Sequence, residues 1–216
     1  MNLSENKALA HIRQEYTSRE LLENTINRNP FVQFGLWMDE AIKSCVLEPT
    51  AMNLATVDES NRPSSRIVLL KGFSEKGFVF FTNYASRKGR ALEKNHYAAI
   101  NFFWPELERQ VRIEGTISYT SREESNEYFS SRPRGSQIGA WGSPQSQLIE
   151  KKELEEKVRE QEQQWQDQII PCPQIWGGYN LVPDYFEFWQ GRPSRLHDRL
   201  TFTLEDQNWI IRRIAP

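Results

Sequence analysis

Cysteine and histidine are scarce in this sequence, and their placement argues against two kinds of site. Of the 216 residues only two are cysteine and three are histidine. Cys45 and Cys172 lie far apart and form no Cys-x-x-Cys pair, which argues against a disulfide framework and a zinc site. His11, His96 and His197 show no metal-ligand spacing. We therefore expect no bound metal.

Net charge and long apolar runs are also lacking. The formal net charge is −2 with 26% charged residues, so no overall basicity points to nucleic acid or an anionic membrane. The apolar runs are far too short to span a bilayer, and the first ten residues lack the apolar core of a signal peptide. We expect a cytoplasmic protein that binds neither nucleic acid nor membrane.

The length suits one sizeable domain. Residues 1–30 are polar and mixed in charge, which predicts a mobile N-terminal arm before a single domain of residues 31–216. Arg13 and Tyr16 share one face of a helical turn, so they can reach a ligand together. The alternative is that both are ordinary surface residues of a fraying arm.

Aromatic residues are abundant, with seven Trp and twelve Phe, which fits a packed core, a ring-stacking site or a buried subunit interface.

Helical spacing from Pro30 predicts an amphipathic helix that ends before Pro49. Ser86 and Ser121 are expected caps of two short helices, and residues 147–168 predict a surface helix. Strands are predicted at 51–57, 65–71, 78–83, 96–103, 109–119, 176–181, 184–189, 201–204 and 209–214. The economical architecture is α+β and mainly β, a closed or split β-barrel with flanking helices.

Two basic stretches suggest anion sites. Arg87 and Lys88 follow the Ser86 cap, where cations oppose the helix dipole unless an anion binds there. A solvated basic turn is the alternative. Arg66 and Lys71 lie on one predicted strand, but their odd separation places them on opposite faces, so one ligand can meet both only at a bend or along the strand edge.

A second group of polar side chains follows the Ser121 cap. Tyr128 and Arg132 are four residues apart on one helix face, and Ser136 comes just after the next turn. A phenol, a guanidinium and a hydroxyl in this arrangement suit a phosphate.

The C-terminal stretch Arg195-x-His197-x-Arg199 places three polar side chains on one face if the chain is extended. Two guanidinium groups beside an imidazole suit an anionic substrate held next to a proton-handling group. The alternative is a solvated strand edge on which Asp198 pairs with one arginine.

Taken whole, this stretch resembles the C-terminal signature of the pyridoxamine (pyridoxine) 5′-phosphate oxidases. The match runs through FEFWQ at 186–190 and RLHDR at 195–199. Four other stretches are similar to the same family: RIVLLK at 66–71, TNYASRKG at 82–89, ERQVRIEG at 108–115 and YFSSRPRGSQIGAW at 128–141. Together with the final Ala215-Pro216 they cover nearly the whole chain after residue 30.

The resemblance implies a split-barrel flavoprotein with FMN at the two-fold interface of a homodimer, and residues of both subunits lining each site. The implied FMN contacts are Arg66, Ile67, Val68, Leu69, Leu70, Lys71, Phe81, Thr82, Arg87, Lys88, Gln110, Gln145, Ser146, Trp189 and Arg199. The implied substrate contacts are Lys71, Tyr128, Arg132, Ser136, Arg195, Leu196 and His197, with Arg13 and Tyr16 as a lid. Arg195 and His197 are the implied catalytic residues.

The implied reaction is FMN-dependent oxidation of pyridoxamine 5′-phosphate and pyridoxine 5′-phosphate to pyridoxal 5′-phosphate. Hydride passes from the substrate C4′ to flavin N5, and O2 reoxidises the flavin to give H2O2. Two rivals are a flavin split-barrel enzyme with another substrate and a non-enzymatic carrier of vitamin B6 phosphates or flavin-binding interaction protein. The first would not need Tyr128, Arg132, Ser136 and the Arg195/His197 pair, and anaerobic bleaching by substrate separates the second.

Overall fold

The computed structural model describes residues 15–16 and 19–216, which form two compact units. The larger unit contains Thr50–Phe102 and Arg112–Tyr185. The smaller unit contains the described residues up to Pro49, together with Phe103–Val111 and Phe186–Pro216. Three strands, β5 (Tyr97–Trp104), β6 (Arg109–Tyr119) and β7 (Trp176–Gln190), continue from one unit into the other.

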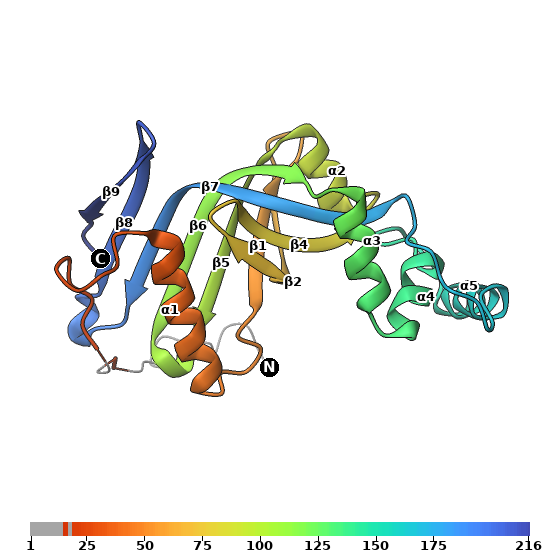
Figure 1. Ribbon diagram of the computed structural model, residues 1–216, viewed down its shortest axis with the longest axis horizontal. Coiled ribbons are helices and arrows are strands. Elements are labelled where there is room, and N and C mark those ends of the chain that lie inside the picture. The colour runs from red at the N-terminus through yellow and green to blue at the C-terminus, as the bar shows by residue number, and fades with distance from the viewer. Residues whose placement is uncertain (1–14, 17–18) are drawn as a thin grey trace, which may run out of the picture. The chain divides into compact units, whose positions relative to one another are not determined.

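The other elements are labelled in Figure 1. They are α1 (Pro30–Lys43), β1 (Ala51–Val57), β2 (Pro63–Leu69), β3 (Gly72–Ser74), β4 (Gly77–Asn83), α2 (Arg87–Lys94), η2 (Pro105–Leu107), α3 (Arg122–Ser131), α4 (Arg134–Gly142), α5 (Lys151–Gln164), η3 (Pro193–Arg195), β8 (Asp198–Glu205) and β9 (Asn208–Arg213).

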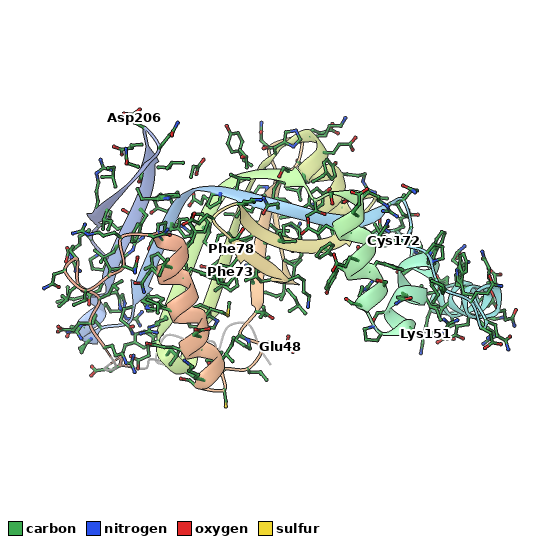
Figure 2. The ribbon with its side chains drawn as sticks, viewed as in Figure 1. Glu48, Phe73, Phe78, Lys151, Cys172 and Asp206 are labelled. Carbon is green, nitrogen blue, oxygen red and sulfur yellow. The ribbon has the colours of Figure 1, made fainter. Side chains whose placement is uncertain are left out.

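The sheet of the larger unit has the strand order β2-β1-β5-β6-β7-β4-β3. β1 pairs antiparallel with β2 and β5, and β4 pairs antiparallel with β3 and β7. Buried residues alternate with half-buried or exposed ones along β1 and most of β6, as expected of strands with one packed face. Phe73 and Phe78, labelled in Figure 2, stack across the β3–β4 hairpin with ring centroids 5.9 Å apart. The mainly-β architecture with flanking helices agrees with the expectation from the sequence.

Helices α3, α4 and α5 belong to the larger unit, and Figure 1 shows α4 beside α5. Ser121 caps α3, as predicted, by accepting from the Glu124 backbone N–H. Phe129 and Ile138 bury their side chains in a cluster with Trp176. The sequence predicted only a turn at residues 133–135, whereas the chain continues there into α4. This helix contains three glycines, Gly135, Gly139 and Gly142, and their low helix propensity explains why the sequence did not predict it.

The smaller unit is built around α1. Asn29 caps this helix by accepting from the Phe31 and Val32 backbone N–H groups, and Pro30 occupies its first turn. Trp37 projects from α1 and packs edge-on against Phe188, with ring centroids 5.3 Å apart. β8 pairs with β7 and with β9, and β8–β9 is the expected final hairpin.

Residues 23–25 form a turn, with Leu21 and Ile26 buried. Two further local expectations were wrong. β7 is one strand across the predicted break near residue 183. The extended conformation expected from Arg195 begins only at Asp198, because Pro193 starts a 3-10 turn and Ser194 and Arg195 take left-handed backbone angles. Among the described residues, no helix is both long and apolar enough to cross a membrane.

Candidate active site

A cavity of about 680 Å³ lies in the larger unit and gathers most of the residues that the sequence singled out there. Its lining residues are Ser64, Ser65, Arg66, Ile67, Val68, Leu69, Lys71, Phe81, Thr82, Asn83, Arg87, Lys88, Tyr128, Arg132, Gln145, Ser146 and Trp176. Five of these are cationic, and no carboxylate belongs to this described lining. The cavity therefore suits an anionic ligand.

Arg66 and Lys71 both reach the cavity, although they are five positions apart in the chain. The chain leaves β2 after Leu69, and the Lys71 backbone N–H donates to Val79 O on β4. This bend supplies the geometry that a single straight strand does not allow. Both side chains can therefore face one ligand.

The basic end of the cavity combines strand and helix. Lys88, in the first turn of α2, is 7% exposed and donates through Nζ to Thr82 Oγ1 at 3.0 Å. Burial, followed by the charge of Arg66, lowers the pKa of Lys88 to about 8. Burial and the neighbouring Arg87 lower the pKa of Arg66. Ser86 caps α2 through the Gly89 N–H, as predicted.

Arg66 is fixed by neutral oxygens. Its Nη1 donates to Leu54 O at 3.0 Å and Thr56 Oγ1 at 2.9 Å, and its Nη2 donates to Ser64 Oγ at 2.6 Å. These acceptors orient the guanidinium without neutralising it. A bound phosphate would supply the missing negative charge and offset the desolvation of Arg66 and Lys88.

The other end of the cavity is aromatic. Phe81 stacks on Tyr128 with centroids 4.1 Å apart, and Trp176 lies nearly parallel to both rings. The Arg132 guanidinium lies over the Trp176 ring at 4.6 Å. Arg132 Nη1 is buried and has no hydrogen-bond partner among the described residues. A donor left in this state points to a ligand that accepts from it.

Ser136 lines a second, smaller cavity of about 240 Å³. Arg132, Gln145 and Trp176 line this cavity as well as the first. Arg132 and Ser136 thus meet one space, as the sequence predicted, while Tyr128 faces the larger cavity. The Gln145 amide oxygen accepts from Thr82 Oγ1 at 3.4 Å, which links the two ends of the lining.

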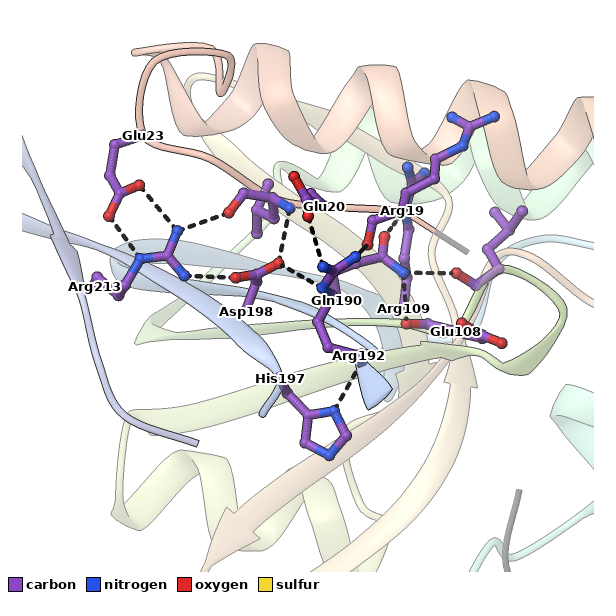
Figure 3. A network of polar contacts seen from close by, with 12 residues as sticks. Arg19, Glu20, Glu23, Glu108, Arg109, Gln190, Arg192, His197, Asp198 and Arg213 are labelled. Atoms are coloured by element: carbon purple, nitrogen blue, oxygen red, sulfur yellow. Dashed lines mark hydrogen bonds and ion pairs between the residues drawn. The ribbon is translucent and has the colours of Figure 1, made fainter. Parts of the chain in front are cut away.

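The remaining predicted site residues lie in the smaller unit, where three rings form a cluster. His197 lies 4.6 Å from the Trp189 ring, and Tyr16 lies 5.6 Å from Trp189 and 5.8 Å from His197. The His197 Nδ1 accepts from the Arg192 backbone N–H at 3.1 Å (Figure 3). Burial, with added repulsion from Arg195 and Arg199, lowers the pKa of His197.

Arg199 does not share a ligand-facing surface with Arg195 in the way that the extended strand predicted. Arg199 Nε donates to Glu187 Oε1 at 2.7 Å, and its Nη1 donates to Ala215 O at 2.9 Å.

The other predicted site residues lie outside these contacts. Arg195 and Leu196 are exposed, and Gln110 is half-buried on β6. Arg13 lies outside the described residues. Leu70 is buried and is absent from the described lining of the large cavity.

The sequence reading missed Trp176 and the partners of Asp198. The alternative considered for Asp198 was pairing with one arginine, and the structure shows it accepting from Arg213 Nη1 at 2.7 Å and pairing with Arg192 Nε at 3.5 Å. Neither contact follows from sequence spacing. The aromatic platform under Arg132 likewise depends on a residue 44 positions away in the chain, so local patterns carry no signal for it.

Two family models match this chain. Residues 38–166 match the family model described as Pyridoxamine 5′-phosphate oxidase. The chain belongs to this family. Residues 176–216 match the model described as Pyridoxine 5′-phosphate oxidase C-terminal dimerisation region. The family is one of oxidases, which places the chain among the oxidoreductases.

Curated members of the pyridoxamine 5′-phosphate oxidase family are similar over almost their full length. The chain is 57% identical over 212 residues to the pyridoxine/pyridoxamine 5′-phosphate oxidase of Paraburkholderia phytofirmans, covering 97% of this chain and 99% of the relative. Its identity to the enzyme of that name from Acaryochloris marina is 50% over 210 residues, covering 97% and 96%. The resemblance inferred from the motifs is confirmed.

Solved structures confirm the split β-barrel class. PhzG from Burkholderia lata 383, in complex with tetrahydrophenazine-1-carboxylic acid, has a TM-score of 0.86 and 27% identity, covering 92% of this chain and 99% of that one. A pyridoxamine 5′-phosphate oxidase-related, FMN binding protein from Nostoc punctiforme has a TM-score of 0.70 and 18% identity, covering 88% and 100%. The second likeness concerns the fold alone.

Proposed function

We propose that this chain oxidises pyridoxamine 5′-phosphate and pyridoxine 5′-phosphate to pyridoxal 5′-phosphate, using FMN and O2, with release of H2O2 and of ammonia from the amine. The observation that carries this proposal is the large cavity, in which cations gather at a basic end and at an aromatic end and the described residues contribute no lining carboxylate. Two phosphorylated ring compounds need two such anion sites. The named function of relatives 50–57% identical to this chain supports the same substrates.

The FMN phosphate is assigned to Arg66, Arg87 and Lys88. Arg87 and Lys88 lie at the α2 N-terminus, where backbone N–H groups and the helix dipole also favour a phosphate, and Arg66 on β2 lines the same cavity. The other implied FMN contacts in the lining, from Ile67 to Leu69 and at Gln145 and Ser146, offer apolar and amide surface beside these cations. When bound, FMN supplies an acceptor for the hydride lost from the substrate C4′.

The substrate phosphate is assigned to Arg132, Ser136 and Tyr128, with Lys71. Arg132 is held on Trp176, and its Nη1 donor has no partner among the residues that the structure describes, so the guanidinium is already oriented to bind an anion. Separate phosphate sites for cofactor and substrate allow each ring to be positioned by its own anchor. Such positioning lowers the entropic part of the barrier to transfer between two bound rings.

His197 and Arg195 are assigned to the polar substituents of the substrate. Because His197 Nδ1 accepts from the Arg192 N–H, the neutral imidazole carries its proton on Nε2. The free ring nitrogen is then a donor. In this role His197 orients a substrate oxygen or ring group and does not remove a proton.

A second copy of the chain is part of the proposal. The matched C-terminal model describes a dimerisation region, and Ile67 and Leu69 at the edge of the cavity are 65% and 37% exposed. Exposed apolar residues beside a ligand site are typical of surfaces that a partner covers. Residues of two copies would then complete each site.

The test is anaerobic. Purified protein loaded with FMN should lose its yellow colour when pyridoxine 5′-phosphate is added without air, and should regain it with air while forming H2O2. Bound flavin that is not bleached by either substrate would refute the oxidase assignment and favour a carrier. Bleaching by tetrahydrophenazine-1-carboxylic acid instead would favour a substrate like the compound bound in PhzG, to which this chain is 27% identical.

A further inference from the structure

Gly191 occupies a position that has no room for a side chain. Gly191 is buried, and its backbone N–H donates to Glu108 O at 2.7 Å. A Cβ atom here would lie 2.7 Å from Tyr16 Cγ, 2.8 Å from Tyr16 Cβ and 3.0 Å from Glu108 Cβ. The backbone of Gly191 is not left-handed, so an alanine would meet no backbone strain. The absence of a side chain at Gly191 therefore leaves the space that Tyr16 occupies.

The next residue, Arg192, contacts both His197 and the segment that follows Tyr16. Its backbone N–H donates to His197 Nδ1. Its guanidinium donates through Nη2 to Glu20 Oε1 at 2.6 Å and through Nη1 to Arg19 O at 3.2 Å, as Figure 3 shows. One residue therefore fixes the imidazole and a piece of chain three to four residues after Tyr16.

Two further contacts hold the same piece of chain. The Leu21 N–H donates to Asp198 Oδ2 at 3.1 Å, and Leu21 is 5% exposed. Arg213 pairs with Glu23 at 2.7 Å and also with Asp198. Segment 19–23 is thus attached to the loop that follows β7 and to β9, which fixes where Tyr16 can lie.

We propose that Gly191 and Arg192 are positioning residues of the oxidase site: Gly191 leaves the space for the Tyr16 ring, and Arg192 holds the chain that carries Tyr16 beside the imidazole of His197. Neither side chain is assigned to substrate. Their effect on the reaction passes through Tyr16 and His197, so this inference rests on the proposed function.

The first experiment is a double-mutant cycle between Gly191→Ala and Tyr16→Ala in the FMN-loaded protein. Gly191→Ala should raise KM for pyridoxine 5′-phosphate about tenfold, with kcat changed less than about threefold, since a displaced ring contact has that order of effect. In the Tyr16→Ala background the added methyl should have no further effect on KM. An equal effect in both backgrounds, or none in either, would overturn the role of Gly191.

The matched control is Gly135→Ala, because a Cβ at Gly135 meets no atom of the described residues within 4 Å. Thermal unfolding of all variants separates a loss of folding from a loss of positioning. If Gly191→Ala does not fold, the Arg192 variants provide the independent test. Arg192→Ala should raise KM, and Arg192→Lys should restore part of the difference because a lysine can still reach Glu20.

The second readout needs no turnover. Trypsin cleavage after Arg19 reports whether this segment is held, and both Arg192→Ala and Gly191→Ala should speed it several-fold relative to the native chain, as expected when a local opening becomes cheaper. Arg212→Ala, which removes an exposed pair with Glu205, is the control and should not change it. Unchanged cleavage in both variants would refute the positioning of the segment. A native chain that is cleaved slowly but does not oxidise substrate would refute the proposed function alone.

Discussion

Arg199 Nε lies 2.7 Å from Glu187 Oε1, and the Glu187 side chain is only 1% exposed. A carboxylate buried to this extent depends on its partner, because an uncompensated charge inside a protein is costly. This ion pair gives Arg199, a residue of the family signature, a structural role in addition to the cofactor contact that the resemblance implies.

Arg199→Ala should therefore destabilise the chain by roughly 3 kcal/mol, the order found when one partner of a buried pair is removed. Glu187→Gln combined with Arg199→Ala should recover part of this loss, because a neutral amide replaces the stranded charge. Urea unfolding of the flavin-free protein measures both. The control is Arg212→Ala on β9, whose exposed pair with Glu205 should contribute less than about 1 kcal/mol. Equal losses in Arg199→Ala and Arg212→Ala would contradict the assignment.

Lys88 predicts how phosphate binding depends on pH. Its pKa is lowered from 10.5 to about 8, so the folded protein favours the neutral amine. Above pH 10.5 the amine is neutral in both the folded and unfolded states, so Lys88 does not change the free energy of unfolding. As pH falls from 10.5 toward 8 the unfolded chain takes up the proton first, and the folded state loses stability until pH is below 8. A bound phosphate opposes this shift, because it favours the charged ammonium.

Binding of inorganic phosphate or FMN should accordingly take up a proton above pH 8, and affinity should fall as pH rises from 8 toward 10.5. The slope should approach tenfold per pH unit for one linked proton. Calorimetry in buffers of different ionisation enthalpy counts the protons. Lys88→Arg should flatten the profile relative to the native chain, since a guanidinium stays charged, and the exposed Lys76→Arg should not. A native slope retained in Lys88→Arg would exclude Lys88 as the linked group.

Trp176 should affect substrate binding indirectly, through Arg132. The Arg132 guanidinium rests 4.6 Å from its ring, a cation–π contact of about 1–2 kcal/mol when desolvated. Trp176→Leu should therefore raise KM for pyridoxine 5′-phosphate about tenfold, with a smaller rise for Trp176→Phe, which keeps a ring. Steady-state kinetics with Trp141→Phe as the control measures this. A Phe variant as impaired as the Leu variant would mean that Trp176 acts only through packing.

The sequence predicted most of the sheet and much of the site, and the differences have physical causes. Predicted strands 51–57 and 109–119 coincide with β1 and β6, because alternation along a half-buried strand is a local signal. The Ser86 and Ser121 caps are equally local. The bend that unites Arg66 and Lys71, by contrast, depends on pairing with β4, and short sequence windows carry no record of it.

The smaller unit shows the same limit in the loop between β7 and β8. Alternation from Arg195 to Arg199 predicted a strand, but Ser194 and Arg195 adopt left-handed angles and leave Arg195 on a turn. Asp198 finds its partners at Arg192 and Arg213, which the chain brings together only after β8 and β9 pair. Non-local partners of this kind fix the loop, and propensity does not encode them.

His197 offers a test of its two ring nitrogens by two isosteric substitutions. Asparagine places its amide oxygen near the position of Nδ1 and keeps an acceptor for the Arg192 N–H, whereas glutamine places its amide nitrogen near Nε2 and keeps a donor for substrate. His197→Asn should thus preserve stability better, and His197→Gln should preserve kcat/KM better. Thermal unfolding and steady-state kinetics of the two variants supply the comparison.

The acid side of the pH profile should distinguish the same two variants from the native chain. Burial and the neighbouring arginines lower the pKa of His197 below 6.5, so the folded protein resists protonation of the ring. Above pH 6.5 the imidazole is neutral in both the folded and unfolded states and contributes nothing to the pH dependence; as pH falls below 6.5 the unfolded chain takes the proton first and stability declines. Both amide variants should lack this decline. If kcat/KM of His197→Gln falls by the same factor as that of His197→Asn, Nε2 does not act as a donor to substrate, and the orientation role assigned to His197 fails.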